Sequence, residues 1–139
     1  MSASERMEKA AGLHQSGYNC AQAVACAFAD KVDMSLEDIF CVLEGFGLGM
    51  GGMQGTCGAV SGAVAIASLL NSKGPDFTQN KAATYKITKE IVKRFEEKNQ
   101  SSICKELKGV ETGTVLRICP GCISDAVGIL EDVIKDFDL

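Results

Sequence analysis

The feature that most restricts how this chain can fold is a glycine-rich run that leads directly into an apolar segment. Half of residues 45–58 are glycine, a residue that is retained where the backbone needs a positive φ or a close approach to another segment. Residues 59–70 are apolar, rich in small side chains and free of helix breakers, which predicts a helix. Thr56 is the expected N-cap of this helix, so Cys57 is predicted in its first turn, behind a flexible glycine loop.

The predicted position of Cys57 gives its thiol a physical reason to be reactive. A helix N-terminus carries about half a positive charge and unpaired N–H groups, and both stabilise a thiolate. Gly55, Thr56 and Gly58 surround this position, so they are the candidate residues for binding an anionic group or a cofactor. The string Gly47-x-Gly49-x-x-Gly52 does not indicate a dinucleotide site, because a helix rather than a strand is expected before it. The alternative is that Cys57 is a small packing residue beside a turn.

Helical signals recur along the rest of the chain, and no segment alternates polar and apolar residues over a useful length. Capping residues mark expected helix starts at Ser2, Asn19, Ser35 and Ser101. The apolar stripes expected to face the core are Ala23–Phe28, Leu36–Leu43, Ala83–Phe95 and Ile123–Phe137. We therefore predict an all-α fold: a single domain over residues 1–139, built as a helical bundle of about five to six helices with a central Gly-rich loop.

Two glycines, one just before residues 59–70 and one within them, indicate where this helix lies in the fold. Gly58 and Gly62 are four residues apart, a spacing that lets the backbone of another helix approach closely. The helix that begins near Cys57 is therefore expected at the centre of the bundle.

Composition and charge exclude several classes of protein. Hydrophobic residues make up 46% and charged residues 23% of the chain, the balance of a soluble globular protein. A net charge of −4 and a pI of about 5.0 argue against nucleic acid or an anionic membrane as a partner. The polar N-terminus lacks a signal-peptide core, and the longest apolar run, residues 63–70, is too short to span a membrane. We therefore expect a cytoplasmic protein.

The chain contains seven cysteines, and an odd number cannot form a closed set of structural disulfides. Cys26 and Cys41 fall inside expected helices and are interpreted as packing residues. The other five fall at expected helix starts: Cys20, Cys57, Cys104, Cys119 and Cys122. A bundle can bring several helix N-termini to one end, where thiolates can exchange disulfides or hold zinc or an iron–sulfur cluster.

Spacing separates these chemistries only in part. Cys119-x-x-Cys122 suits one reducible disulfide or half of a metal site, and the second close pair of a zinc ribbon is missing. Ile123 follows Cys122 where a haem-attachment motif requires histidine, so there is no covalent haem motif. His14, the only histidine, is interpreted as a packed or rim residue of the first helix, although it is the one available imidazole ligand.

Three segments and a late cysteine resemble the C_GCAxxG_C_C family of redox-active proteins. The segments are Gly17-Tyr-Asn-Cys20-Ala-Gln-Ala-Val24, Gly51-Gly-Met-Gln-Gly-Thr-Cys57-Gly-Ala-Val-Ser-Gly62 and Cys104-Lys-Glu-Leu-Lys-Gly109. The resemblance covers nearly the whole chain and implies a redox role carried by four shared cysteines, often alongside a transporter. Carried over to this sequence, the four are Cys20, Cys57, Cys104 and one of Cys119 or Cys122, with Cys119 favoured.

Three functional hypotheses follow. The first is a thiol-based oxidoreductase in which Cys57 is a low-pKa thiolate that Cys20, Cys104 or the Cys119/Cys122 pair resolves as a disulfide. The second is a module in which Cys20, Cys57, Cys104 and Cys119 hold zinc or an iron–sulfur cluster for electron or metal transfer. The third is a structural or regulatory partner of a transporter. The sequence leaves open the substrate, the cofactor, the redox or transporter partner and whether the chain forms a homo-oligomer.

Overall fold

The computed structural model describes all residues from 1 to 139, and it contains α-helices, three short 3₁₀ turns and no strand. The α-helices are α1 (Ala3–Gln15), α2 (Cys20–Cys26), α3 (Leu36–Leu43), α4 (Gly47–Met50), α5 (Gly58–Asn71), α6 (Lys81–Asn99), α7 (Cys104–Lys108) and α8 (Cys119–Asp136). The 3₁₀ turns are η1 (Ala29–Lys31), η2 (Glu44–Phe46) and η3 (Thr78–Asn80). The predicted all-α fold is confirmed. None of the helices combines the length and the apolar character that crossing a membrane requires.

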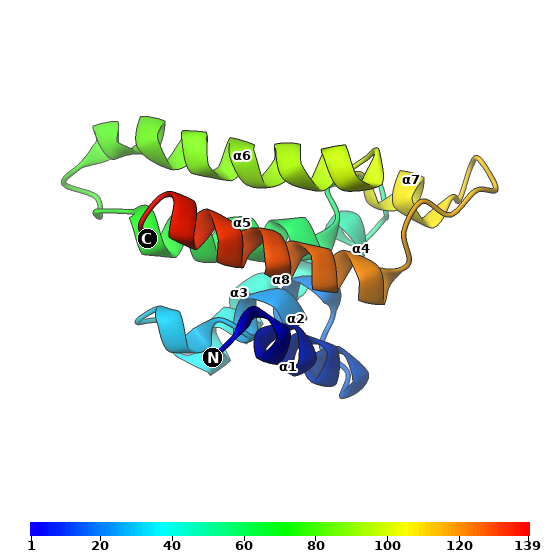
Figure 1. Ribbon diagram of the computed structural model, residues 1–139, viewed down its shortest axis with the longest axis horizontal. Coiled ribbons are helices and arrows are strands. Elements are labelled where there is room, and N and C mark those ends of the chain that lie inside the picture. Colours follow the sequence, from blue (N-terminus) through cyan, green and yellow to red (C-terminus); the bar gives the residue numbers. More distant parts are fainter.

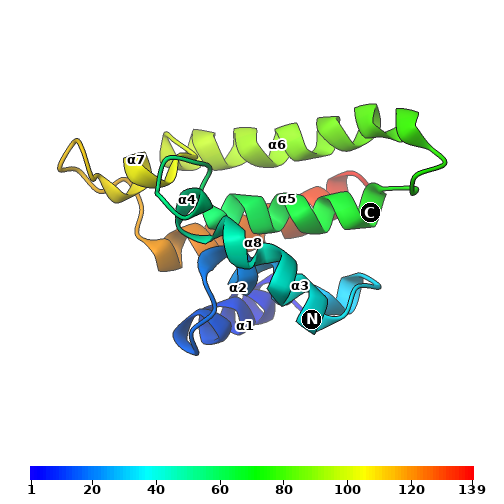
Figure 2. The same ribbon diagram turned by 180° about the vertical axis from the view of Figure 1, so that it is seen from behind.

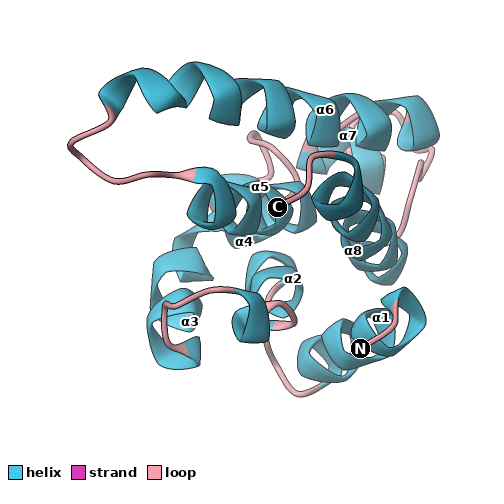
Figure 3. Cartoon of the chain, turned by 60° about the vertical axis from the view of Figure 1, so that its left-hand side comes forward, coloured by secondary structure: helices cyan, strands magenta, loops and turns pink.

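The helices form three layers, which are visible from the side of the molecule (Figure 3). α6 forms one outer layer, α5 and α8 form the middle layer, and α1, α2 and α3 form the other outer layer. α5 contacts both α2 and α6, and α8 packs against α1, α5 and α6. Figures 1 and 2 show α4 and α7 together at one end of the layers. α5 and α8 begin at this same end.

The central position of α5 depends on two glycines, as the sequence predicts. A Cβ atom on Gly62 would lie 2.6 Å from the carbonyl oxygen of Ala21, and one on Gly58 would lie 3.2 Å from the Ala21 nitrogen. Both contacts are with the backbone of α2, which cannot move aside as a flexible side chain can. The two glycines therefore allow α2 and α5 to pack backbone against backbone.

The core is one cluster of 27 buried hydrophobic residues. A buried arginine forms hydrogen bonds to two other parts of the chain next to this core. Arg6 of α1 is 1% exposed and lies over the ring of Phe28. Its guanidinium donates to Glu131 of α8 at 2.6 Å and to Asp30 at 2.6 Å, and it also donates to the carbonyl of Ala27 at 2.7 Å. Because the buried charge is paired and its donors are occupied, its desolvation is compensated.

The expected caps are confirmed at three helix starts and wrong at two. Ser2 and Asn19 form full capping boxes, and the side chain of Ser35 accepts a hydrogen bond from the backbone of α3. Cys57 itself, and not Thr56, is the N-cap of α5, because Thr56 pairs with Ile103 in an isolated antiparallel bridge. The N-cap of α7 is likewise Ile103 and not Ser101.

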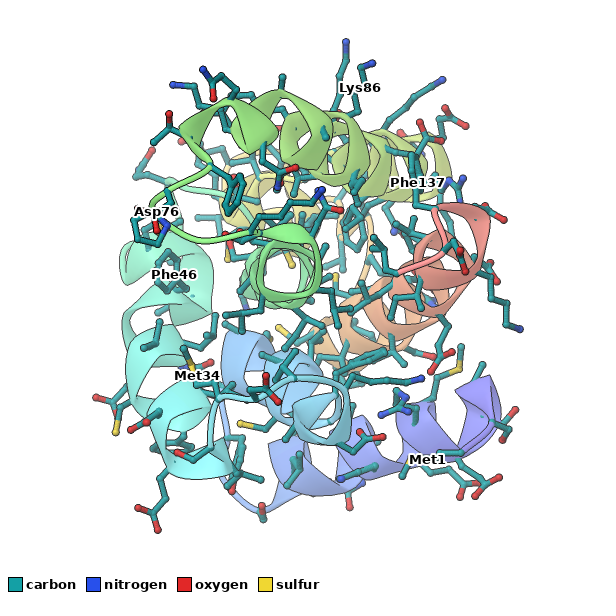
Figure 4. The ribbon with its side chains drawn as sticks, turned by 90° about the vertical axis from the view of Figure 1, so that its left-hand side faces the viewer. Met1, Met34, Phe46, Asp76, Lys86 and Phe137 are labelled. Atoms are coloured by element: carbon teal, nitrogen blue, oxygen red, sulfur yellow. The ribbon has the colours of Figure 1, made fainter.

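Several residues that were expected to face the core are exposed instead. Cys41 is exposed, because it is two residues from both Ile39 and Leu43, which are the buried positions of α3, and therefore lies on the opposite face of that helix. Leu36 in the first turn of α3, Ala83 near the start of α6 and Phe137 at the end of α8 are also exposed. Figure 4 shows Phe137 at the edge of the molecule, and Lys86 projecting from the outer face of α6.

Candidate functional site

Five cysteines meet in one small cavity at the end of the bundle where α5, α7 and α8 begin. The cavity has a volume of about 210 Å³. Its lining comprises Cys20, Cys57, Cys104, Cys119 and Cys122 together with His14, Asn19, Leu48, Gly58, Leu107, Lys108 and Arg117. All seven cysteines of the chain are free thiols, and Cys26 and Cys41 lie outside the cavity. The structure therefore brings together every cysteine that begins a helix and neither of the others.

Cys57 lies where the N-terminus of α5 can stabilise a negative charge on its sulfur. It is the N-cap residue of α5, next to the positive end of the helix dipole, and Cys122 lines the same cavity. The neighbouring Cys122 side chain is the main cause that lowers the pKa of Cys57 to about 7; burial acts in the opposite direction, and the backbone of Ala59 and Val60 and the charge of Lys108 lower the pKa further. Cys57 is therefore the cysteine of the cavity whose pKa is lowered toward neutral pH.

Cys122 is the partner of Cys57, and we call these two residues the inner pair. Cys57 is 6% exposed and Cys122 is 2% exposed. The neighbouring Cys57 sulfur, together with burial, raises the pKa of Cys122 well above its usual range. The thiol of Cys122 donates a hydrogen bond to the carbonyl oxygen of Arg117 at 3.8 Å. The inner pair thus consists of a cysteine of lowered pKa and a protonated thiol, both shielded from solvent.

Cys20 and Cys119 form a second pair, which we call the outer pair because both residues are partly exposed. The sulfur of Cys119 is close enough to Cys20 to act on its pKa, and the ammonium of Lys108 donates a hydrogen bond to the Cys119 sulfur at 3.2 Å. Burial, followed by the nearby sulfurs of Cys119 and Cys57, raises the pKa of Cys20 to about 12. Cys20 is therefore protonated at neutral pH.

The spacing of Cys119-x-x-Cys122 suits one reducible disulfide or half of a metal site, and that interpretation stays a prediction. In the structure each of the two residues also has a cysteine neighbour from another part of the chain, Cys20 for Cys119 and Cys57 for Cys122. The first turn of α8 therefore supplies one thiol to each pair. Residues i and i+3 lie on the same face of a helix, so the two sulfurs can belong to different pairs and still line one cavity.

Cys104 lines the cavity but belongs to neither pair. Burial raises its pKa, and its backbone N–H donates to the carbonyl of Gly55 at 3.0 Å. A Cβ atom on Gly49 would collide with the side chain of Cys104, and the φ of Gly49 is +55°. Glycine is therefore required at position 49 by both the backbone conformation and the space next to Cys104.

The glycine-rich segment that was expected to be a flexible loop is held by backbone hydrogen bonds. Within it, Gly55 donates to the carbonyl of Gly49 at 3.0 Å. Outside it, Lys105 donates to the carbonyl of Met53 at 2.9 Å, and Cys57 donates to the carbonyl of Ser102 at 2.7 Å. The segment is thus tied to the residues around the start of α7, and this contact fixes Cys57 beside Cys104.

The three residues near Cys57 that were candidates for binding a cofactor occupy different surroundings. Gly58 lines the cavity, whereas Thr56 faces a separate, larger groove of about 970 Å³ between α3, α5 and α6. The N–H and the C=O of Gly55 are both engaged in backbone hydrogen bonds. Cys57 itself occupies the N-cap position of α5.

The charged residues of the cavity are basic, and sequence analysis did not identify them. Lys108 and Arg117 line the cavity, and no aspartate or glutamate does. Lys108 is four residues after Cys104, a spacing that places both on one face of a helix, and this signal was present in the sequence. Arg117 donates a hydrogen bond to the buried carboxylate of Asp125, eight residues further along the chain, at 3.1 Å.

The candidate metal ligands Cys20, Cys57, Cys104 and Cys119 all line the cavity. No group of three or more His, Cys, Asp or Glu side chains is arranged to hold a metal ion.

Comparison with known proteins identifies the family. No curated protein and no solved structure matches this chain. The model of the family described as "Putative redox-active protein (C_GCAxxG_C_C)" matches residues 18–133, a range that includes all five cysteines of the cavity. The chain therefore belongs to the C_GCAxxG_C_C family.

Proposed function

We propose that this protein is a thiol–disulfide oxidoreductase in which Cys57 is the nucleophile and Cys122 resolves the mixed disulfide. The observation that carries this proposal is that Cys57, the N-cap residue of α5, and Cys122, in the first turn of α8, are buried in one cavity. A low-pKa thiolate next to a second thiol is the arrangement that dithiol redox chemistry requires. A reducing compartment such as the cytoplasm keeps such thiols reduced between turnovers.

The reaction is written here for a small disulfide, RSSR, as the oxidant. The Cys57 thiolate attacks one sulfur of RSSR, so that a Cys57–SR bond forms and RS⁻ leaves. Cys122 then loses its proton and attacks the Cys57 sulfur, which closes the Cys57–Cys122 disulfide and releases the second RS⁻. The proton of Cys122 leaves on one of the two products as RSH. Two electrons pass from the inner pair to the substrate.

Burial restricts what can react directly with the inner pair. Cys57 is 6% exposed and is reached through a cavity of about 210 Å³, a volume below the range of drug-sized ligand pockets. Its substrate is therefore a small molecule. The basic residues Lys108 and Arg117, with no carboxylate in the lining, favour a small disulfide that carries negative charge.

The proposal is tested on the Cys119→Ser variant, which keeps the inner pair and removes the outer one. Reduced protein is treated with one equivalent of hydroxyethyl disulfide and quenched in acid, and its disulfides are mapped by mass spectrometry. We expect a Cys57–Cys122 disulfide that dithiothreitol reverses. Adding Cys57→Ser should abolish it, and adding Cys104→Ser should not. If the Cys119→Ser protein retains every thiol, Cys57 and Cys122 are not a redox pair.

A metal-binding module is the second candidate function, because four of its candidate ligands line one cavity. Anaerobic purification followed by metal and acid-labile sulfide analysis tests it. Stoichiometric iron and sulfide would support an iron–sulfur cluster and overturn the dithiol proposal. Metal-free protein that loses two thiols reversibly on mild oxidation would overturn the metal candidate.

A further inference from the structure

The outer pair is a second dithiol that the reaction of the inner pair does not use. Cys20 and Cys119 are partly exposed, whereas Cys57 and Cys122 are buried. All four thiols line the same cavity. The two pairs are joined through the first turn of α8, because Cys119 belongs to one and Cys122 to the other.

We propose that the two pairs form an internal disulfide relay, in which Cys119 and Cys122 pass the disulfide from the buried inner pair to the partly exposed outer pair. This inference rests on the proposed function of the inner pair. It gives the protein a capacity of four electrons. It also separates two partners: a small oxidant at Cys57, and a dithiol protein that reduces the outer pair at the surface.

The first step of the relay transfers the disulfide onto α8. The Cys119 thiolate attacks the Cys122 sulfur of the Cys57–Cys122 disulfide, so that a Cys119–Cys122 bond forms and the Cys57–Cys122 bond breaks. Cys57 leaves as a thiolate. The attacking sulfur is the one that receives the hydrogen bond from Lys108, and the leaving sulfur is the one that the N-terminus of α5 stabilises. A leaving thiol of low pKa departs fastest.

The second step moves the disulfide to the outer pair. Cys20 gives up its proton and attacks the Cys119 sulfur, which forms the Cys20–Cys119 bond and breaks the Cys119–Cys122 bond. Cys122 leaves as a thiolate and takes up the proton that Cys20 lost. Two electrons have moved from the outer pair to the inner pair, and no external reagent is consumed.

The direction of transfer follows from the stabilised thiolate. Stabilising the thiolate of a dithiol pair stabilises the reduced form of that pair. The disulfide form of such a pair is therefore the stronger oxidant of the two disulfides. Cys57 is the N-cap residue of α5, and the positive end of that helix stabilises its thiolate and so the reduced inner pair. At equilibrium a single disulfide should therefore occupy the outer pair.

The relay is tested by mapping the disulfide after one equivalent of hydroxyethyl disulfide has reacted and the protein has equilibrated. In the wild type we expect the disulfide at Cys20–Cys119. In Cys20→Ser protein the relay stalls after its first step, so the disulfide should lie at Cys119–Cys122 and Cys57 should be free. In Cys119→Ser protein the disulfide should remain at Cys57–Cys122. Excess oxidant should consume four paired thiols in the wild type.

Two controls match these variants. Cys104→Ser changes a thiol in the same cavity, and Cys41→Ser changes one outside it; neither should alter the wild-type map. Cys20→Ala, whose side chain cannot form hydrogen bonds, should give the same Cys119–Cys122 disulfide as Cys20→Ser. Far-UV circular dichroism verifies the fold of each variant. A disulfide that stays at Cys57–Cys122 in wild-type protein, while the same bond forms in Cys119→Ser protein, overturns the relay alone. The absence of that bond in Cys119→Ser protein overturns the proposed function, and the relay with it.

Discussion

The side-chain nitrogen of Lys108 lies 3.2 Å from the sulfur of Cys119. The hydrogen bond to Cys119 raises the pKa of Lys108, so the ammonium form is retained over the whole neutral range. The same charge also acts to lower the pKa of Cys57. One lysine on α7 therefore influences both pairs, although it contributes no electrons itself.

Replacing Lys108 with methionine should make Cys57 less reactive at neutral pH, because one of the charges that favour its thiolate is lost. We expect the rate of Cys57 alkylation at pH 7 to fall several-fold, and its pH midpoint to rise. Lys108→Arg keeps the charge and should retain most of the reactivity. Quantitative mass spectrometry of alkylated peptides across pH measures both. An unchanged midpoint in Lys108→Met would show that the lysine has only a structural role.

The pH dependence of Cys57 itself provides a second prediction. Alkylation of Cys57 in reduced protein should show a midpoint near pH 7, as its pKa of about 7 requires, and not near 9.0, the ordinary value from which it is lowered. Because burial slows the reagent, the midpoint and not the absolute rate is the quantity to compare. A midpoint above pH 8 would contradict the thiolate assignment.

The same shift has a consequence for stability. The folded-state pKa of Cys57 is depressed, so its thiolate adds stability at pH values above the unfolded pKa, and this contribution is lost as the pH falls through about 7. The free energy of unfolding of the wild type relative to Cys57→Ser should therefore increase between pH 7 and 9. Urea titrations at several pH values measure this difference, and a difference that falls over that interval would reverse the sign of the argument.

Gly62 is a test of the close approach between α2 and α5. In Gly62→Ala the new methyl group would meet the Ala21 carbonyl at 2.6 Å, and overpacking of this kind destabilises a protein by about 1–3 kcal/mol. Gly12→Ala is the matched control, because Gly12 is exposed within α1 and has no atom within 4 Å of an added Cβ. Alanine there should stabilise the protein by up to about 1 kcal/mol. Denaturant midpoints compare the two.

Cys41 and Cys26 were interpreted alike in the sequence, but they should behave differently. Cys41 is exposed, so a thiol reagent should label it in native protein. Cys26 is fully buried and burial raises its pKa, so it should react only on unfolding. Cys26→Ala should destabilise the protein slightly by leaving a small cavity, and Cys41→Ser should be neutral. Labelling followed by peptide mapping decides the order.

Local signals account for most of the helices and for the gathering of thiols. Ser2 and Asn19 begin helices because capping depends on residues three positions apart, which a sequence displays directly. The position of α5 could be predicted because the spacing of Gly58 and Gly62 is also local. Cysteines at helix starts converge when those starts share one end of the bundle.

The remaining features depend on contacts between distant segments. Thr56 is not a cap, because it pairs with Ile103, which no local rule connects to it. Cys119 has Cys20 as a neighbour because α2 packs against α8. Cys41 is exposed because α3 lies in an outer layer and is covered on one face only.

The origin of the paired thiols in three separate helices, α2, α5 and α8, also has a consequence for biosynthesis. The neighbouring Cys122 is the largest cause of the lowered pKa of Cys57, and Cys122 belongs to the last helix. A nascent chain that has not yet produced α8 therefore lacks this neighbour. The surroundings that lower the pKa of Cys57 are complete only when α8 has been translated and has packed against α5.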